Sequence, residues 1–299
     1  MNYKELNLLE FQELFSTEEA CERALEQAKW PKGFVCPKCN HQGGYRLSAE
    51  RIMQCAGCRR QTSLTAGTIF HKTRTPLRIW FWIMYLVAQD KGGTSALRLS
   101  KQLEIRYETV WFILQKIRSA MQQRDEKITL SGFLEIDQAF FGRAATAKKP
   151  RKAHNQAQVL VVVESMGTKA GNVFMQVIDA ASRDSMRAVL AKKVEPAQSV
   201  RTDGWQANHV IRSMGHQLNA KPLPGVKGIQ HLPWVHIAIS LAKRFILGTY
   251  HGVSAVHLQR YLDEFCYRFN RRHRGNQLFE RLLKASALAD PRYYAVLTG

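Results

Sequence analysis

The sequence contains no apolar run of about eighteen residues, the length that a membrane-spanning helix needs. Its first residues, 1–6, also lack the order of a signal peptide, in which a charged stretch precedes an apolar one. We therefore expect a soluble, cytoplasmic protein without a membrane partner.

Acidic residues are scarce: 24 Asp and Glu stand against 44 Lys and Arg, which gives a net charge of +20 and a pI near 10.0. Such an excess of positive charge favours a polyanionic partner, and nucleic acid is a more natural one than a membrane surface. The apolar content of 45% excludes a disordered chain, and 299 residues leave room for two or three small domains.

Cysteine is also sparse, yet four of the six cysteines fall in two Cys-x-x-Cys pairs. The first pair is Cys36 and Cys39, and the second, after fifteen intervening residues, is Cys55 and Cys58. In a reducing compartment this spacing is typical of a structural Zn²⁺ held by four thiolates and not of disulfides. A segment so poor in large apolar residues would hardly fold without a metal, so we predict a zinc ribbon over residues 31–72.

Helical spacing of apolar residues dominates the rest of the N-terminal half. Residues 6–29 show this spacing, with a helix start near Ser16 that Glu19 supports as in a capping box. Residues 77–87 form a second, strongly apolar helical pattern. We therefore predict helices on both sides of the ribbon.

Two shorter helical patterns, 94–103 and 107–118, are separated by a break around residues 104–106. Helix, short turn and helix is the order of a helix-turn-helix DNA-binding motif. In this interpretation DNA meets the exposed face of the second helix, whose residues are Arg106, Tyr107, Thr109 and Lys116. A helical bundle without nucleic-acid contacts shows the same pattern, and this alternative stays open.

The segment 143–155 is a loop with five Lys or Arg residues, among them Lys148, Lys149, Arg151 and Lys152. It is either a solvated run of charge or a clamp for the phosphate backbone of DNA. The basic residues around the ribbon leave the same two interpretations open.

Three stretches, 130–142, 158–164 and 171–179, have the composition of neighbouring strands. In the first, Glu135 and Asp137 are two residues apart and therefore share one face. A further short strand ends in an Asp-Gly turn at Asp203. Alone, Asp203 would be a turn former. Two acids on strands of so basic a chain indicate more than that.

A helix that begins at Trp234 places His236, Ser240 and Lys243 on one face. Acids at the ends of neighbouring strands, with a polar residue opening a late helix, form the arrangement that a two-metal phosphoryl-transfer site requires. Two Mg²⁺ ions about 4 Å apart would activate the attacking oxygen and neutralise charge on the leaving oxygen.

Several ungapped motifs, in this order along the chain, resemble the bacterial insertion-sequence 1595 family of transposases. They are the two cysteine pairs and residues 134–137, 140–142, 201–205, 247–254, 258–265 and 268–272. The resemblance extends from the first helix to about Arg272. It implies a multidomain α+β protein in which a zinc ribbon and a helix-turn-helix precede a ribonuclease-H-like mixed α/β catalytic domain.

The domain boundaries that we expect are 1–30 for a helical lead-in, 31–72 for the ribbon, 73–127 for the helix-turn-helix domain, 128–274 for the catalytic domain and 275–299 for a C-terminal tail.

The resemblance further implies a bacterial, nucleoid-associated enzyme that cuts double-stranded DNA at transposon ends and joins the 3′-hydroxyls to a target. Asp137 and Asp203 match the first two catalytic acids of the family, and His236 matches the third position, where part of the family also has His. Imidazole would tilt the preference of the site from Mg²⁺ toward Mn²⁺. Lys243, followed by Arg244, matches a lysine suited to holding a DNA phosphate. Pairing of two DNA ends implies a homodimer or a higher assembly.

Two residues depart from the family pattern. Leu241 stands where the His-bearing subgroup has Asn, and Gln138 stands where the family usually has an acid. Loss of a polar neighbour of the metal site would weaken catalysis. Two alternatives therefore stay open: a transposase-derived DNA-binding protein that acts as a repressor or assembly factor, and a nuclease of the same fold that cuts branched DNA or RNA hybrids.

Overall fold

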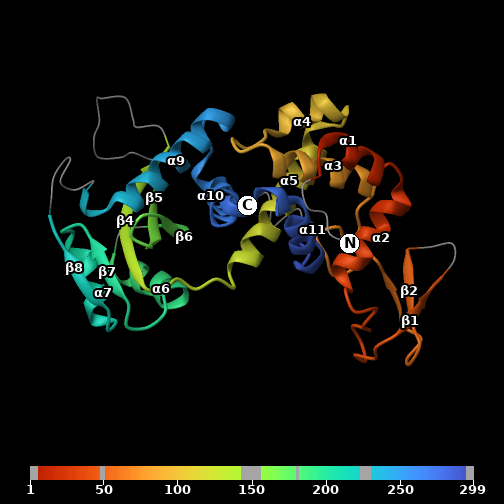
Figure 1. Cartoon of the computed structure of the whole chain (residues 1–299), viewed down its shortest axis with the longest axis horizontal. Helices are drawn as coiled ribbons and strands as arrows, with labels where there is room; N and C mark the ends of the chain where they lie inside the picture. The colour runs from red at the N-terminus through yellow and green to blue at the C-terminus, as the bar shows by residue number, and fades with distance from the viewer. Residues whose placement is uncertain (1–5, 48–50, 143–155, 180–181, 223–229, 294–299) are drawn as a thin grey trace. The chain divides into compact units, whose positions relative to one another are not determined.

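The computed structural model describes residues 6–47, 51–142, 156–179, 182–222 and 230–293 (Figure 1). Its contacts divide the chain into unit 1, Met1–Arg124 with Arg274–Gly299, and unit 2, Asp125–His273. The basic loop 143–155, with Lys148, Lys149, Arg151 and Lys152, lies outside the described residues. None of the helices in the described ranges is long and apolar enough to cross a membrane.

Unit 1 combines helices with a small sheet. Its helices are α1 (Leu8–Leu14), α2 (Glu18–Lys29), α3 (Leu77–Gln89), α4 (Ala96–Leu103), α5 (Tyr107–Asp125), which ends at the boundary, and α11 (Leu278–Leu288), which the 3-10 helix η2 (Arg272–Gln277) precedes. Its strands are β1 (Gly44–Arg46), β2 (Ile52–Cys55) and β3 (Gln61–Ser63), and they pair antiparallel in this order.

Side-chain caps start the first two helices. Asn7 and Glu10 form a capping box at α1, because each side chain accepts a hydrogen bond from the backbone N–H of the other. Thr17 caps α2, where its Oγ1 accepts from the backbone N–H of Ala20 at 3.2 Å. The predicted start near Ser16 is therefore one residue too early.

The core of unit 1 is aromatic. Phe11 of α1 lies 4.1 Å from the ring of Tyr85 in α3 and 5.3 Å from the ring of Phe279 in α11, measured between ring centroids. Helix α11 packs on both α2 and α3. The last segment of the chain, expected from the sequence only as a tail, thus completes the core around the first helices.

Helices α4 and α5 form the predicted helix pair. Helix α4 ends at Glu104, which takes a left-handed conformation with φ of +54° and turns the chain toward α5. At the start of α5, Arg106 and Tyr107 are exposed and Thr109 is half-buried.

Lys116 is buried, and the prediction that it belongs to the exposed face of α5 is wrong. The helix is enclosed continuously from Ile113 to Met121, because it runs through the middle of unit 1. The Lys116 ammonium lies 4.9 Å from the ring centroid of Phe112 and 5.8 Å from that of Trp80. Burial lowers the pKa of Lys116, so this residue serves packing and not a DNA-facing surface.

Unit 2 is built on a five-stranded sheet with helices on both faces (Figure 1). Its strands are β4 (Phe133–Phe141), β5 (Ala157–Ser165), β6 (Ala170–Ile178), β7 (Ser199–Thr202) and β8 (Gln217–Ala220). Its helices are α6 (Arg183–Lys193), the 3-10 helix η1 (Gln206–His209), α7 (Val210–Ser213), α9 (Pro233–Tyr250) and α10 (Ala255–Asn270).

The sheet has the strand order β6-β5-β4-β7-β8. The three long strands are neighbours as predicted, and they pair antiparallel, whereas β7 and β8 join parallel. This mixed order is that of a ribonuclease-H-like domain, and it agrees with the expected fold. Strand β8 is missing from the sequence prediction because its residues are half-buried or exposed at the sheet edge and show no apolar pattern.

Each face of the sheet has its own core. Alternate residues of β4, such as Ala139 and Phe141, pack against α9 and α10, whereas Leu134 and Ile136 pack against α6 and α7. This alternation places Glu135 and Asp137 on the α9 face and Gln138 on the α6 face.

Candidate functional site

The four cysteines of the ribbon converge on one point. The Sγ atoms of Cys36 and Cys58 lie 3.6 Å apart, those of Cys39 and Cys55 lie 3.7 Å apart, and all four lie within 4.8 Å of one another. A tetrahedral Zn²⁺ with bonds of about 2.3 Å separates its sulfur ligands by about 3.8 Å. The donor set and its spacing therefore fit the structural zinc that the sequence predicts.

The same local turn builds both halves of this zinc site. Asn40 and Arg59, each one residue after a cysteine pair, have φ of +56° and +58°, and their N–H groups donate to the carbonyls of Cys36 and Cys55. Burial raises the pKa of the Cys36 thiol, but backbone N–H groups that donate to its sulfur bring the pKa to about 6. Local backbone geometry thus prepares a thiolate for a cation.

Two basic residues of the ribbon bind α2. Arg51 forms an ion pair with Glu18 at 2.6 Å, and both Arg46 and Arg51 contact the buried Glu22. The sequence left a solvated surface or a DNA contact open for these arginines. The structure instead uses them to attach the ribbon to the helical part of unit 1.

In unit 2 the parallel pairing of β4 and β7 places Asp137 beside Asp203. Ile136 pairs with Thr202. Asp137 follows Ile136 in β4, and Asp203 follows Thr202 directly after β7. His236, in the first turns of α9, has its Nδ1 3.7 Å from Oδ2 of Asp137. We call Asp137, Asp203 and His236 the acid site.

The electrostatic environment of Asp137 shows how closely these groups converge. The pKa of the Asp137 carboxyl lies above its usual value, chiefly because of burial and also because of the negative charge of Asp203. The hydrogen bond from the backbone N–H of Gln138 and the charges of His236 and Lys243 act in the opposite direction and lower this pKa. Only 15% of the Asp137 side chain is exposed. Two carboxylates so close together in a partly buried place repel each other, and a cation between them removes this repulsion.

A buried carboxylate attaches α9 to the sheet beside the acid site. Glu135 is fully buried, and its Oε2 accepts from the backbone N–H groups of Trp234 at 2.8 Å and Val235 at 3.0 Å. These N–H groups belong to the first turn of α9, whose N-cap residue, Leu232, makes no side-chain cap. A carboxylate also interacts favourably with the positive end of the helix dipole. Glu135 therefore determines where His236 lies relative to Asp137.

The turn after β7 holds Asp203 in place. Its Oδ1 accepts from the backbone N–H of Trp205 at 3.2 Å and from Nδ2 of Asn208 at 2.6 Å. Sequence reasoning missed both Glu135 as a helix cap and Asn208 altogether. An acid two residues before Asp137 offered a weak signal for the first, whereas a single Asn in a short helix offered none.

Other predicted residues lie on exposed surfaces. Lys243 and Arg244 are exposed on α9, and the Lys243 ammonium lies 5.7 Å from the ring centroid of Phe141. Leu241 is 37% exposed on the same helix. Arg106, Tyr107 and Thr109 belong to unit 1, so they form no part of the acid site within unit 2.

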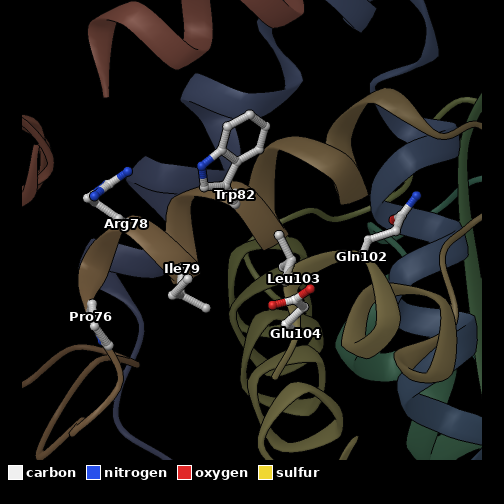
Figure 2. A pocket seen from close by; sticks show the side chains of 7 residues that line it. All are labelled: Pro76, Arg78, Ile79, Trp82, Gln102, Leu103 and Glu104. Atoms are coloured by element: carbon white, nitrogen blue, oxygen red, sulfur yellow. The ribbon is translucent and has the colours of Figure 1, made fainter. Parts of the chain in front are cut away.

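A pocket of about 440 Å³ lies in unit 1 between α3 and the end of α4 (Figure 2). Its lining combines Ile79, Trp82 and Leu103 with the charged Arg78 and Glu104. In Figure 2, Arg78, Ile79 and Trp82 extend from α3, and Leu103 and Glu104 lie at the end of α4. It holds neither the acids of unit 2 nor the cysteines of the ribbon, so the chemistry suggested by the sequence lies elsewhere.

The acid site fits a divalent cation. The 3.7 Å between Nδ1 of His236 and Oδ2 of Asp137 is short enough for both atoms to reach one ion whose ligands lie about 2.1 Å from it. Two carboxylates and an imidazole suit Mg²⁺ or Mn²⁺, and the imidazole favours Mn²⁺.

One curated relative matches the chain over most of its length. This relative, described as an uncharacterized protein in transposable element ISH50 of Halobacterium salinarum, is 25% identical over 281 residues, covering 84% of this chain and 90% of the relative.

Solved structures resemble the chain only loosely. A pre-cleavage Mos1 transpososome matches at 9% identity and a TM-score of 0.30, over 71% of this chain and 78% of that one. A simian T-cell lymphotropic virus intasome, in complex with PP2A regulatory subunit B56 gamma, matches at 12% identity and a TM-score of 0.30. That match covers 45% of this chain and 48% of the other, so the chain spans about half of it.

Two family models match successive parts of the sequence. The transposase zinc-ribbon domain covers residues 16–61, and the ISXO2-like transposase domain covers residues 129–270. The first contains the four converging cysteines, and the second contains the acid site with Lys243. Because the models of both domains belong to one family and together cover more than half of the chain, the chain belongs to the insertion-sequence 1595 family of transposases.

Proposed function

We propose that the protein is an active DNA transposase and that Asp137, Asp203 and His236 bind its catalytic metal ions. The observation that carries this proposal is the meeting of the three side chains from the middle of β4, the residue after β7 and the start of α9, where Asp137 and His236 are 3.7 Å apart. The three residues are separated by up to about a hundred residues in the sequence. Two adjacent carboxylates in a partly buried place repel each other, so they cost stability and are not explained by a structural role alone.

The chain's own residues have distinct tasks in this mechanism. Asp137, Asp203 and His236 would hold Mg²⁺ or Mn²⁺, which lowers the pKa of an attacking water or 3′-hydroxyl and neutralises the leaving oxygen. Lys243, exposed about two turns after His236 on α9, would bind a DNA phosphate through its ammonium. The buried Glu135 keeps α9, and with it His236 and Lys243, at the sheet.

The overall reaction consists of two phosphoryl transfers. In the first, a water oxygen bonds to phosphorus at a transposon end and the bond to the 3′-oxygen breaks, which leaves a 3′-hydroxyl and a 5′-phosphate. In the second, that 3′-hydroxyl bonds to a phosphorus of target DNA and displaces another 3′-oxygen. Both steps need the same metal ligands, so one site serves both.

For DNA binding we propose the start of α5 and the exposed side of α9. Arg106 and Tyr107 are exposed at the start of the second helix of the pair, Thr109 lies beside them, and Arg244 adds charge near the acid site. The basic residues Lys148, Lys149, Arg151 and Lys152 remain candidates from the sequence. Pairing of two DNA ends would require a dimer or larger assembly of this chain.

The decisive experiment incubates the purified protein with duplexes taken from the DNA that flanks its gene, in Mg²⁺ or Mn²⁺. We expect cleavage at the 3′ end and joining to a second duplex, and loss of both by at least about 10³-fold in Asp203→Asn, because this change removes a charged ligand. Asp184→Asn, the same change at an exposed position of α6 in the same unit, is the matched control. Cleavage that survives in Asp203→Asn would disprove the assignment.

Leu241→Asn tests the alternative that the protein only binds DNA. We expect the wild type to cut, with Leu241→Asn changing the rate by less than about tenfold. If the wild type binds but does not cut and Leu241→Asn restores cutting, the protein is a silenced transposase that acts through DNA binding.

A further inference from the structure

A fully buried amide lies beside Asp203. Asn208, in η1, has no exposed surface. Its Nδ2 donates to Oδ1 of Asp203 at 2.6 Å and to Oγ1 of Thr202 at 2.5 Å, and its Oδ1 accepts from Nε2 of Gln138 at 3.0 Å. Both amide hydrogens and the carbonyl oxygen of Asn208 therefore have partners.

These hydrogen bonds have a direction that Asp203 dictates. An ionised carboxylate only accepts, so the NH₂ group of Asn208 must face it. The carbonyl of Asn208 then faces Gln138, which must present its own NH₂ group. Reversal of the Asn208 amide would set its carbonyl against the carboxylate and its NH₂ against that of Gln138, at a site that water does not reach.

We call the hydrogen bonds from Gln138 through Asn208 to Asp203 the amide relay. The relay approaches Asp203 from the α6 face of the sheet, opposite to the face that carries His236. Gln138 lies on the α6 face, where it also approaches the sulfur of Met186, whereas Asp137 lies on the α9 face with His236. In the described part of the chain the hydrogen bonds to Asp203 end on Oδ1. They orient the carboxylate so that its other oxygen, Oδ2, can serve a cation.

We propose that Asn208 is a positioning residue of the divalent-metal site and that Gln138 sets its orientation. The inference rests on the proposed function, because it treats Asp203 as a metal ligand. Hydrogen bonds that orient a ligand typically contribute about 10–100-fold to metal affinity. The relay also gives Gln138 a task, since an ionised acid at this position could accept but not donate and would attract the NH₂ group of Asn208 away from Asp203.

The test measures Mn²⁺ affinity by titration calorimetry on the full-length, zinc-loaded protein, without DNA. Asn208→Leu keeps the branched shape and the number of heavy atoms of the side chain and removes its hydrogen bonds, so we expect Mn²⁺ to bind about 10–100-fold more weakly. Gln138→Met removes only the donor that orients Asn208, and we expect a loss of about three- to tenfold. Gln176→Met, the same change on β6 of the same sheet, is the matched control and should bind as the wild type does.

Asp203→Asn separates this proposal from the proposed function. If Asp203→Asn binds Mn²⁺ like the wild type, the metal site itself is misassigned. If Asp203→Asn loses binding while Asn208→Leu, folded with an unchanged unfolding temperature, does not, only the relay is disproved. Should Asn208→Leu fail to fold, Gln138→Met decides the question, and wild-type affinity in that variant overturns the proposal.

Discussion

The zinc ribbon and the acid site, which we propose as a second metal site, are built in opposite ways. The four ribbon ligands lie between Cys36 and Cys58, and two copies of one local turn present them. The acid site joins Asp137, Asp203 and His236 from two strands and a helix. The ribbon core contains few large side chains besides Phe34 and Met53, whereas both faces of the unit 2 sheet are covered by helices.

This difference shows which interactions stabilise the fold around each site. In the ribbon, the metal supplies the cohesion that a small core cannot. In unit 2, the apolar cores form the scaffold, and the buried side chains Glu135 and Asn208 orient α9 and Asp203 through hydrogen bonds. The predictions below test this contrast, from the largest expected effect to the smallest.

Removal of zinc should unfold the ribbon and leave unit 2 intact. Structural Zn²⁺ binding is worth about 10–16 kcal/mol in small zinc domains, far more than the core around Phe34 can supply. Hydrogen exchange after chelation should show lost protection in β1, β2 and β3 and unchanged protection in β4, β5 and β6. Cys39→Ser should reproduce the effect without a chelator. If β4 loses protection as well, the two sites are not independent.

Glu135→Ala should destabilise unit 2 by about 3 kcal/mol, because it leaves the backbone N–H groups of Trp234 and Val235 buried without an acceptor. Glu135→Gln keeps an acceptor oxygen and should cost about 1 kcal/mol. Urea unfolding followed by the exchange protection of α9 measures both. Equal stability of the two variants would show that packing, not the cap, holds α9.

Asp263→Asn should flatten the pH dependence of stability in unit 2. Burial raises the pKa of Asp263 to about 7, the hydrogen bond from Gln259 lowers it, Asp125 and Glu126 raise it, and Lys193 lowers it. Since this pKa is raised on folding, the stability contributed by Asp263 is complete below about pH 4 and is lost as pH rises through about 7. One pKa unit corresponds to about 1.4 kcal/mol, so the ionised carboxylate costs a few kcal/mol at pH 8.

The measurement for Asp263 is the free energy of unfolding at pH 5 and pH 8. We expect a smaller decrease between these values in Asp263→Asn than in the wild type. Asp184→Asn, on α6 of the same unit, is a control that should keep the wild-type dependence. An unchanged decrease in Asp263→Asn would assign the pH dependence to other groups.

Arg51→Ala should have the smallest effect, about 1 kcal/mol or less, on attachment of the ribbon to α2. Its partners are Glu18 and the buried Glu22, but the arginine itself is 38% exposed and screened by solvent. Hydrogen exchange of β2 at low and high salt measures the effect. Arg60→Ala, an exposed neighbour, should leave the exchange unchanged, and an equal effect of both variants would exclude a specific ion pair.

Particular residues show which features of the fold and of the sites could be predicted from the sequence. The spacing of the cysteines predicted the zinc site, and the β-branched run at 158–164 predicted a strand, because both signals act over a few residues. The strand and helix patterns singled out Asp137, Asp203 and His236, but only the family motifs assigned them to one site, since no local pattern links residues so far apart. Strand β8 escaped prediction because an edge strand needs no apolar pattern.

The sequence by itself determined the main parts of this protein: a cysteine-bound ribbon, a helix pair and a sheet domain with acids, in a strongly basic chain. Only the tertiary structure decided that Lys116 is enclosed, that Glu135 caps a helix about a hundred residues away and that Asn208 holds Asp203. The physical reason is that helix and strand patterns depend on neighbours within one or two turns. Burial and hydrogen-bond partners are set instead by which distant segments pack together.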